Sequence, residues 1–557
     1  MVALRRCLLF LIAVVTLAAQ AAELHPSATA IASAHPLATK AGEEILAHGG
    51  NAFDAAVAVA ATLAVVEPYH SGLGGGGFFL LHRARDGFEV MIDARERAPY
   101  AATRDMYLDR DGRPVLGRSI DGALAAGIPG VPAALVHLAG KYGRLALAQD
   151  LAPAIRLARD GFPVTRAYAK MTLRQHDRLT NGFPEAARVF YRGGFIIAPG
   201  EKLGQPELAY TLERLADRGG RGFYSGTIAA RLVDGVRAAG GIWSKKDLSD
   251  YRVVEREPLR GMYRGVRITT AALPSSGGIV LMEALHLLQG FDLDAMDKTQ
   301  RDQTVIEAMR LAYRDRARYL GDPDFVHVDV ARLLEPAYVA KLRQEMGAAQ
   351  PSPAASPANA TGEGRNTTHF SIIDRDGNRV AATLSLNTAF GCGVMPPGTG
   401  VVLNNEMDDF SVKPGVPNTY GLIGKDANAI APGKRPLSSM TPTFLESDDA
   451  VVALGTPGGS RIISMVLLAT LEFAHGRGGP KDWVALPRFH HQYLPDVVQY
   501  EPTAFDDAEK RALEQRGYRL EAVRGGYGNM QAVAWYKKSG KLEAASDPRG
   551  EGLAQVK

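Results

Sequence analysis

Cysteine is scarce in this sequence, and neither sign of charge predominates. Cys7 and Cys392 are the two cysteines among 557 residues, and Cys7 falls in an N-terminal segment that we expect to be removed. The remaining chain then has no internal disulfide, so a large hydrophobic core must stabilise the fold. Lys and Arg number 64 against 60 Asp and Glu, which leaves a net charge of +4. Without a basic block, this balance does not indicate a nucleic-acid-binding protein.

Several motifs typical of other chemistries are absent or misplaced. Gly72–Gly77 contains the letters G-x-G-x-x-G, but the run follows a predicted helix and precedes a predicted strand, the reverse of the order in a dinucleotide site. His490-His491 lacks the H-E-x-x-H spacing and the cysteine partners of a zinc site, and no G-x-S-x-G motif of a serine esterase occurs. We therefore expect neither a metal nor an organic cofactor, and we interpret the glycine run as close backbone packing.

The N-terminus carries two basic residues followed by an apolar run. Residues 1–22 combine Arg5 and Arg6 with an apolar run from Leu8 to Ala19 and the cleavage pattern Ala19-Gln20-Ala21, which is typical of a secretory signal peptide. The run is short for a membrane span, although a retained anchor is the alternative. We expect export across the inner membrane to the periplasm, with no stable membrane anchor.

Local patterns predict several helices and strands. Asn51 is a good N-cap, and residues 52–66 after it are apolar all round, which predicts a buried helix. The runs 78–81 and 88–94 predict two strands. One face of a further helix is marked by Ile306, Met309, Tyr313 and Leu320.

The clearest linker lies at residues 348–361, which are rich in Ala, Pro and Ser. A strand-like run begins at Thr367 shortly after it. If the chain breaks between Asn366 and Thr367, the threonine gains a free α-amino group that can act as the base for its own hydroxyl. An N-terminal threonine activated in this way is a known form of covalent catalysis.

Asp376-Gly377 separates two strand-like runs and predicts a β-hairpin. With the turn centred there, Thr367 lies opposite residue 386 or 387. Alternation then places three polar residues on one face of the second strand: Thr383, Ser385 and Asn387. We expect Ser385 and Asn387 to lie within reach of Thr367, although a slip of one residue in the register would reverse the faces.

Seven short motifs stand out along the chain. They are Gly49-Gly50-Asn51-Ala52, Asp93-Ala94-Arg95-Glu96, Pro274-Ser275-Ser276-Gly277-Gly278, Asn366-Thr367-Thr368-His369, Asn404-Asn405-Glu406-Met407-Asp408-Asp409-Phe410, Pro436-Leu437-Ser438-Ser439-Met440 and Pro457-Gly458-Gly459-Ser460-Arg461. None is specific alone, but their order is that of the γ-glutamyltranspeptidases, a family of N-terminal-nucleophile hydrolases. From about residue 35 to residue 549 the sequence resembles this family.

The resemblance implies an α+β fold, a four-layer αββα sandwich built from both parts of a self-cleaved precursor. It implies cleavage at Asn366-Thr367 into a large subunit of residues 23–366, with a flexible linker near 348–366, and a small catalytic subunit of residues 367–557. The implied activity is transfer of γ-glutamyl groups from glutathione and similar donors to water, an amino acid or a dipeptide, without a cofactor.

The resemblance also implies roles at the reaction centre. Thr367 resembles the family's nucleophile, and the backbone N–H groups of Gly458 and Gly459 resemble its oxyanion hole. Thr368 and Thr383 resemble residues that support processing and the geometry of the nucleophile. From the residues alone, the same threonine also fits a glycosylation-type sequon or a polar strand start, and the two glycines fit a plain turn before a helix.

A second group of residues is implied for binding of the donor. It consists of Arg95, Ser385, Asn387, Glu406, Asp409, Tyr420, Ser438 and Ser439. Arg95 and the two neighbouring serines would bind the α-carboxylate, and the two acidic residues with Asn387 would bind the α-ammonium. Ser385 keeps a hydroxyl where the family more often has threonine. The alternatives are a surface ion pair between Arg95 and Glu96 and a solvated acidic loop.

The segment 413–424 resembles a lid that is present in some family members. Tyr420 would be the gate over the pocket, and a surface loop with one aromatic residue is the alternative. Two other functions stay open from the sequence: an acylase of the same family that cleaves glutaryl or related side chains, for instance from β-lactams, and an exported binding protein that kept the fold and lost catalysis.

Overall fold

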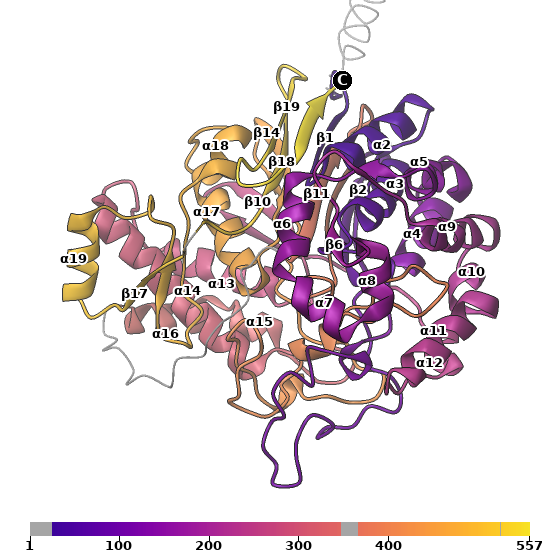
Figure 1. Cartoon of the computed structure of the whole chain (residues 1–557). Coiled ribbons are helices and arrows are strands. Elements are labelled where there is room, and N and C mark those ends of the chain that lie inside the picture. Colours follow the sequence, from indigo (N-terminus) through magenta and orange to yellow (C-terminus); the bar gives the residue numbers. More distant parts are fainter. Residues whose placement is uncertain (1–24, 347–365, 524) are drawn as a thin grey trace, which may run out of the picture.

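The computed structural model describes residues 25–346 and 366–557 except residue 524 (Figure 1). The predicted signal peptide and the linker at 348–361 lie outside these residues. Among the described helices, none is both long enough and apolar enough to cross a membrane. The described side chains also include no group of three His, Cys, Asp or Glu placed to hold a metal ion.

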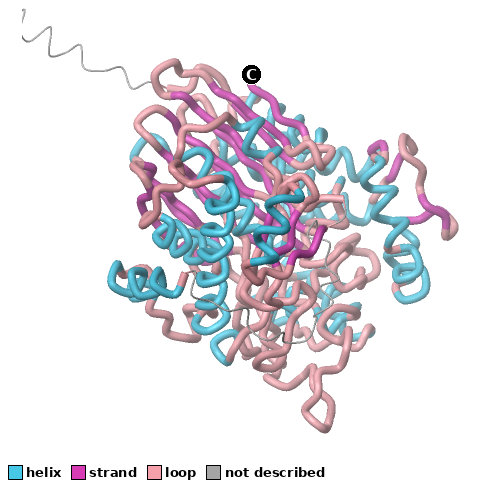
Figure 2. The backbone as a smooth tube through the Cα atoms, turned by 90° about the vertical axis from the view of Figure 1, so that its left-hand side faces the viewer, coloured by secondary structure: helices cyan, strands magenta, loops and turns pink. Residues whose placement is uncertain are grey.

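Two antiparallel sheets stack face to face at the centre of the molecule (Figures 1 and 2). The first has seven strands in the order β20 (Leu553–Val556), β1 (Ala30–Ser33), β11 (Thr367–Ile373), β12 (Arg379–Ser385), β2 (Gly76–Arg83), β3 (Phe88–Asp93) and β8 (Val254–Arg256). The second has six in the order β19 (Leu542–Ser546), β18 (Gln531–Tyr536), β14 (Ala450–Gly455), β13 (Thr443–Glu446), β10 (Val266–Thr270) and β9 (Leu259–Tyr263). Short strands form three smaller sheets: β15 (Phe489–His490), β16 (Val498–Tyr500) and β17 (Leu520–Ala522); β4 (Phe162–Pro163) and β7 (Lys202–Leu203); β5 (Tyr191–Arg192) and β6 (Phe195–Ile196).

Helices cover the outer face of each large sheet (Figure 1). The layer on the seven-stranded sheet includes α2 (Pro36–Ala47), α3 (Ala52–Val66), α4 (Val131–Lys141), α5 (Leu147–Asp160) and α9 (Pro206–Arg218). The layer on the six-stranded sheet includes α13 (Gly277–Leu288), α14 (Lys298–Tyr319), α16 (Pro336–Glu345) and α17 (Ile462–Ala474). The shorter or peripheral helices are α6 (Arg166–Arg174), α7 (His176–Gly182), α8 (Pro184–Phe190), α10 (Arg221–Tyr224), α11 (Gly226–Ala238), α12 (Lys245–Ser249), α15 (Val330–Leu333), α18 (Pro480–Ala485) and α19 (Asp507–Gln515). The predicted four-layer αββα sandwich is confirmed.

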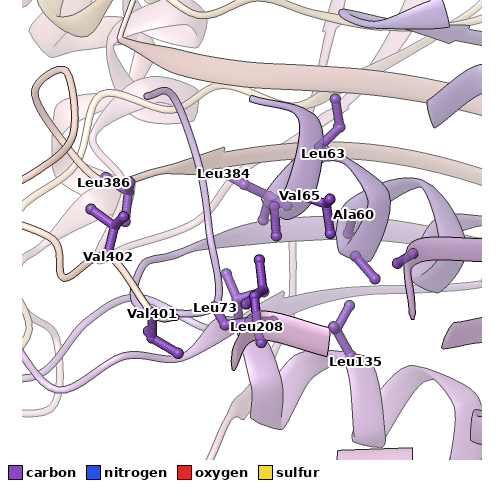
Figure 3. Close-up of a cluster of buried hydrophobic side chains, with 14 of the residues drawn as sticks. Ala60, Leu63, Val65, Leu73, Leu135, Leu208, Leu384, Leu386, Val401 and Val402 are labelled. Carbon is purple, nitrogen blue, oxygen red and sulfur yellow. The ribbon is translucent and has the colours of Figure 1, made fainter. Parts of the chain in front are cut away.

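Helix α3 shows how local signals define an element of the core. Asn51 caps it through its side chain, and Asp54 returns a hydrogen bond to the Asn51 N–H at 2.8 Å. Every residue of the helix is buried, and its apolar side chains pack against β12 and against neighbouring helices (Figure 3). The predicted boundaries of residues 52–66 are those of the structure.

The glycine run at residues 72–77, which leads into β2 and includes its first two residues, serves close backbone packing, as predicted. A Cβ at Gly74 would lie 1.9 Å from the carbonyl oxygen of Val402, and a Cβ at Gly77 would lie 2.1 Å from that of Thr383. No side chain fits at these positions, because adjacent chain segments already occupy the space. The run therefore brings the backbones of β2 and β12 together.

The hairpin of β11 and β12 is present, but its predicted register was wrong. Thr367 pairs with Ser385, one residue before the nearer of the two expected partners. The connection is five residues long and centred on Asp376, because the Asp374 carboxylate accepts hydrogen bonds from the Asp376 and Asn378 N–H groups at 3.0 and 2.9 Å. A side-chain-stabilised turn of this kind shifts the centre by half a residue relative to a tight two-residue turn.

Candidate active site

Thr367 begins β11, on the face that looks toward the second sheet. Its Oγ1 lies 3.1 Å from Ser385 Oγ. The Ser385 hydroxyl can also donate to the carbonyl oxygen of Asn366 at 3.3 Å, and it accepts from the Asn387 N–H at 2.8 Å. The chain is continuous through Asn366–Thr367 in this structure, so the Thr367 nitrogen is a peptide amide here.

The side chain of Thr368 points to the opposite face of the sheet, away from the hydroxyl groups of Thr367 and Ser385. Its Oγ1 donates to Glu67 Oε2 at 3.0 Å, at the C-terminal end of α3. Burial alone would raise the pKa of Glu67, but His70, His35 and the Thr368 hydroxyl together outweigh burial and lower it. The ionised carboxylate of Glu67 therefore holds Thr368, the residue that follows Thr367 in the chain.

Thr383 lies two pairs further along the hairpin, opposite His369, and contacts His369 rather than Thr367. Its Oγ1 is 2.8 Å from His369 Nδ1, and His369 Nε2 is 3.1 Å from Ser371 Oγ. Burial lowers the pKa of His369 to about 3, so the ring is neutral at physiological pH. His369 was not singled out from the sequence, although it lies two residues after Thr367 and so on the same face of the strand.

Most of the residues predicted to be functional line one small pocket. The lining consists of Thr367, Ser385, Asn387, Glu406, Asp409, Tyr420, Leu422, Ser438, Ser439, Met440, Gly459, Ser460 and Ile462. Four separate stretches of sequence meet here, around β11 and β12, the 406–422 region, the serine pair and the start of α17. Arg95, Gly458, Thr368 and Thr383 are not part of the lining.

Arg95 lies behind the acidic side of the pocket and is fully buried. Its Nη1 donates to Glu406 and its Nη2 to Asp409, while its Nη1 is 3.6 Å from Glu96. The alternative of a surface ion pair with Glu96 is wrong, because neither side chain reaches solvent. Burial raises the pKa of Glu406 to about 7, although the charge of Arg95 opposes the rise.

Tyr420 lies against the glycine pair and closes one side of the pocket. Its hydroxyl donates to the carbonyl oxygen of Asn387 at 2.6 Å, and its carbonyl accepts from Gln492 at 3.0 Å. A Cβ at Gly459 would lie 2.5 Å from Tyr420 Cε1. The aromatic ring therefore needs a glycine beneath it, and the alternative of an exposed surface aromatic is wrong, since Tyr420 is 7% exposed.

The glycine pair joins β14 to the short 3₁₀ turn Gly459–Arg461 that leads into α17. Gly458 has φ +154° and Gly459 has φ +58°. The Arg461 N–H donates to the Gly458 carbonyl at 3.1 Å, which closes the turn. The backbone N–H groups thus lie at the start of a helix, where partial positive charge is available to a nearby anion.

The serine pair accepts hydrogen bonds from the protein on its inner side. Ser438 Oγ accepts from the Met440 N–H at 3.1 Å, and Ser439 Oγ accepts from Arg316 Nη2 at 3.2 Å. Arg316 was not predicted from the sequence. The sequence nevertheless offered a clue to Arg316. It lies three residues after Tyr313 and so on the apolar face of the predicted helix, where a charged side chain is unexpected.

Two stacked antiparallel sheets between helical layers, with a threonine at the start of a central strand, define the class of N-terminal-nucleophile hydrolases. The solved cephalosporin acylase from Bacillus halodurans is similar in structure, with a TM-score of 0.84 and 30% identity over 95% of this chain and 96% of that one. The fold class is therefore supported by an independent structure as well as by topology.

The Gamma-glutamyltranspeptidase family model matches residues 38–556, and the chain belongs to this family. It is 42% identical to a glutathione hydrolase proenzyme of Escherichia coli (strain K12), over 93% of this chain and 90% of that protein. It is 43% identical to a glutathione hydrolase proenzyme of Pseudomonas sp. (strain A14), over 88% and 86%. The resemblance found in the sequence is confirmed.

Proposed function

We propose that the protein is a γ-glutamyltransferase and glutathione hydrolase, made as a precursor that cleaves itself between Asn366 and Thr367. The observation that carries this proposal is the pocket itself. The Thr367 hydroxyl opens into the same space as two carboxylates and two serine hydroxyls. A nucleophile beside groups of both kinds suits a substrate that carries an α-ammonium and an α-carboxylate.

Self-cleavage starts from the precursor geometry. The Thr367 oxygen attacks the carbonyl carbon of Asn366, the peptide C–N bond breaks, and the Asn366 acyl group moves to the threonine oxygen as an ester. Ser385 Oγ, 3.3 Å from the Asn366 carbonyl oxygen, donates to the negative charge that develops there. Water then hydrolyses the ester, which frees the threonine hydroxyl and α-amine and leaves residues 23–366 and 367–557 as two subunits after removal of the signal peptide.

Donor binding uses the charges around the pocket. Ser438 and Ser439 already accept hydrogen bonds on their inner side, so their O–H groups remain to donate to the α-carboxylate. Glu406 and Asp409, together with Asn387, would receive the α-ammonium. The sequence led us to expect Arg95 at the α-carboxylate, but its side chain is fully buried and donates to Glu406 and Asp409, so we assign it to holding these two carboxylates in place. A zwitterionic group inserted here keeps the local charge balanced, which lowers the cost of burying it.

Acyl transfer then proceeds in two steps. The Thr367 α-amine, with an ordinary pKa of about 7.7–8.0, removes the hydroxyl proton as the oxygen attacks the γ-carbonyl. The N–H groups of Gly458 and Gly459 stabilise the oxyanion. The amine Cys-Gly leaves with the proton, and a γ-glutamyl ester remains until water, an amino acid or a dipeptide resolves it. These steps use no cofactor.

An acylase with a glutaryl substrate is the second candidate, favoured by the structural likeness to a cephalosporin acylase. A glutaryl group lacks the α-amine, so Glu406 and Asp409 would share only the cation of Arg95 when buried under it, and one negative charge would stay uncompensated. A site built for a polar group can reject an analogue that lacks it by about 10⁴-fold. We expect γ-glutamyl-p-nitroanilide to be strongly preferred over glutaryl-p-nitroanilide in kcat/KM, and Asp409→Asn to reduce that preference.

The decisive experiment uses purified full-length protein. Denaturing gels should show two chains, the smaller beginning at Thr367, and incubation with glutathione should release glutamate, with γ-glutamyl transfer when glycylglycine is added. Thr367→Ala should stay a single inactive chain. An uncut wild type without turnover would favour the binding-protein alternative, and equal rates on the two anilides would favour the acylase.

A further inference from the structure

Arg316 is a buried cation for which the described part of the chain provides no carboxylate partner. It is 6% exposed and lies on α14, behind the serine wall of the pocket. Two other arginines of the same helix form ion pairs, Arg310 with Glu307 at 2.7 Å and Arg314 with Glu345. The hydrogen bonds from the Arg316 side chain to described residues go instead to hydroxyl groups. Such a charge is costly to bury, which suggests that a negative charge approaches it in the working protein.

The hydrogen bonds of Arg316 fix the direction of two serine hydroxyls. Its Nε donates to Ser276 Oγ at 2.9 Å, and the Ser276 hydroxyl donates to the carbonyl oxygen of Ser438 at 2.6 Å. Its Nη2 donates to Ser439 Oγ at 3.2 Å. A guanidinium has only donors, so Ser439 must accept on this side. Its single proton is then free to point into the pocket that it lines.

The electrostatic environment agrees with this geometry. Burial lowers the pKa of Arg316, while Asp409 is close enough to oppose that effect and Arg95 adds to it. The guanidinium is therefore within range of the charged groups of the pocket. An anion bound at the Ser439 hydroxyl would accept a hydrogen bond from that hydroxyl, which the positive charge of Arg316 polarises. Hydrogen bonds to an ionised acceptor are stronger than those between neutral groups.

We propose that Arg316 is a positioning residue for the donor's α-carboxylate: it turns the Ser439 hydroxyl toward that group and supplies positive charge behind it. The inference rests on the γ-glutamyltransferase activity proposed above. It assigns to α14, an element of the large subunit, a part in choosing substrates that carry the carboxylate.

Three anilides separate this role from a general structural one. γ-Glutamyl-p-nitroanilide has both α-groups, 4-aminobutyryl-p-nitroanilide lacks only the α-carboxylate, and glutaryl-p-nitroanilide lacks only the α-amine. Arg316→Met should raise KM for the γ-glutamyl substrate and lower its kcat/KM by about 10- to 100-fold, with kcat changed much less. The slow reaction of the 4-aminobutyryl substrate should stay within about twofold of the wild type, because it has no carboxylate to lose.

Further variants test whether the effect passes through Ser439. Ser439→Ala should resemble Arg316→Met, and the double variant should be little worse than either single one, since residues that act as a unit are not additive. Arg310→Met is the matched control on the same helix and should leave all three substrates unchanged. Self-cleavage at Thr367 reports folding in each case. If Arg316→Met does not fold, Arg316→Lys and Ser276→Ala decide by the same comparison of anilides.

Equal losses on the γ-glutamyl and 4-aminobutyryl substrates, or full additivity with Ser439→Ala, would overturn the proposed role of Arg316 and leave the activity intact. A wild type that fails to turn over γ-glutamyl-p-nitroanilide would instead overturn the proposed activity, and the role of Arg316 with it. The two failures are distinguishable, because the second is seen before any variant is compared.

Discussion

Among single residues, Gly459 has little freedom to change. Its φ of +58° disfavours any residue with a Cβ, and that Cβ would lie 2.5 Å from the ring of Tyr420. We predict that Gly459→Ala lowers kcat by about 10²–10³ and raises KM less, because the shifted backbone would move the N–H that stabilises the oxyanion. Steady-state kinetics with γ-glutamyl-p-nitroanilide measure both constants.

The control for this prediction removes the ring. Gly459→Ala combined with Tyr420→Ala relieves the side-chain clash but leaves the backbone strain, so kcat should stay low relative to Tyr420→Ala alone. Recovery of kcat in the double variant would assign the loss to crowding and remove the evidence for an oxyanion hole at this position.

Glu406 gives the proposed reaction a pH dependence that differs from that of the nucleophile. Burial raises its pKa to about 7, and the ionised form binds the α-ammonium, so KM for the donor should fall as the pH rises through about 7. By contrast, kcat should rise toward about pH 8 as the Thr367 α-amine loses its proton. Profiles of kcat and KM across neutral pH separate the two groups.

Glu406→Gln tests the assignment, because glutamine keeps the shape and cannot ionise. The inflection in KM near neutrality should disappear, while the rise in kcat remains. An unchanged inflection in the variant would show that another group titrates there.

At the scale of elements, the features that depend on neighbouring residues could be predicted from the sequence better than the features that depend on tertiary contacts. The bounds of α3 followed from Asn51 and the apolar run after it, because a cap and burial are written in adjacent residues. The register of β11 was missed, since it depends on the Asp374 side chain in the turn. The contact of Arg316 with Ser439 joins residues 123 positions apart, and no local pattern specifies it.

The end of α3 and the start of β11 are coupled through Glu67 and Thr368. We predict that Glu67→Ala slows self-cleavage by about tenfold, because a hydrogen bond to an ionised group fixes the strand that presents Thr367. Glu67→Gln keeps an acceptor and should cleave at nearly the wild-type rate. The fraction of intact chain over time, measured on denaturing gels, gives these rates.

Thr368→Val removes the hydroxyl with little change in shape, so it should slow cleavage as much as Glu67→Ala does. The double variant with Glu67→Ala and Thr368→Val should cleave itself no more slowly than either single variant. If Glu67→Ala cleaved at the wild-type rate, the carboxylate would have a role in stability and none in presenting the nucleophile.

At the scale of the whole molecule, cleavage after Asn366 would divide both sheets between two chains. In the seven-stranded sheet, β11 and β12 of the proposed small subunit lie between β1 and β2 of the large one. In the six-stranded sheet, β10 and β9 of the large subunit extend the strands of the small one. Each subunit alone would expose unpaired strand edges and the core side chains that the other subunit covers, which isolated chains in water do not tolerate.

We therefore predict that the cleaved subunits stay together until they unfold. They should co-elute in equal amounts on size exclusion in native buffer, and urea should separate them in the same transition that removes secondary structure, because the interface is the core itself. Circular dichroism and size exclusion along one urea series make the comparison. The uncut Thr367→Ala chain is the control and should unfold with a similar change in circular dichroism. Release of a folded subunit in native buffer, before any loss of secondary structure, would contradict the interleaved arrangement.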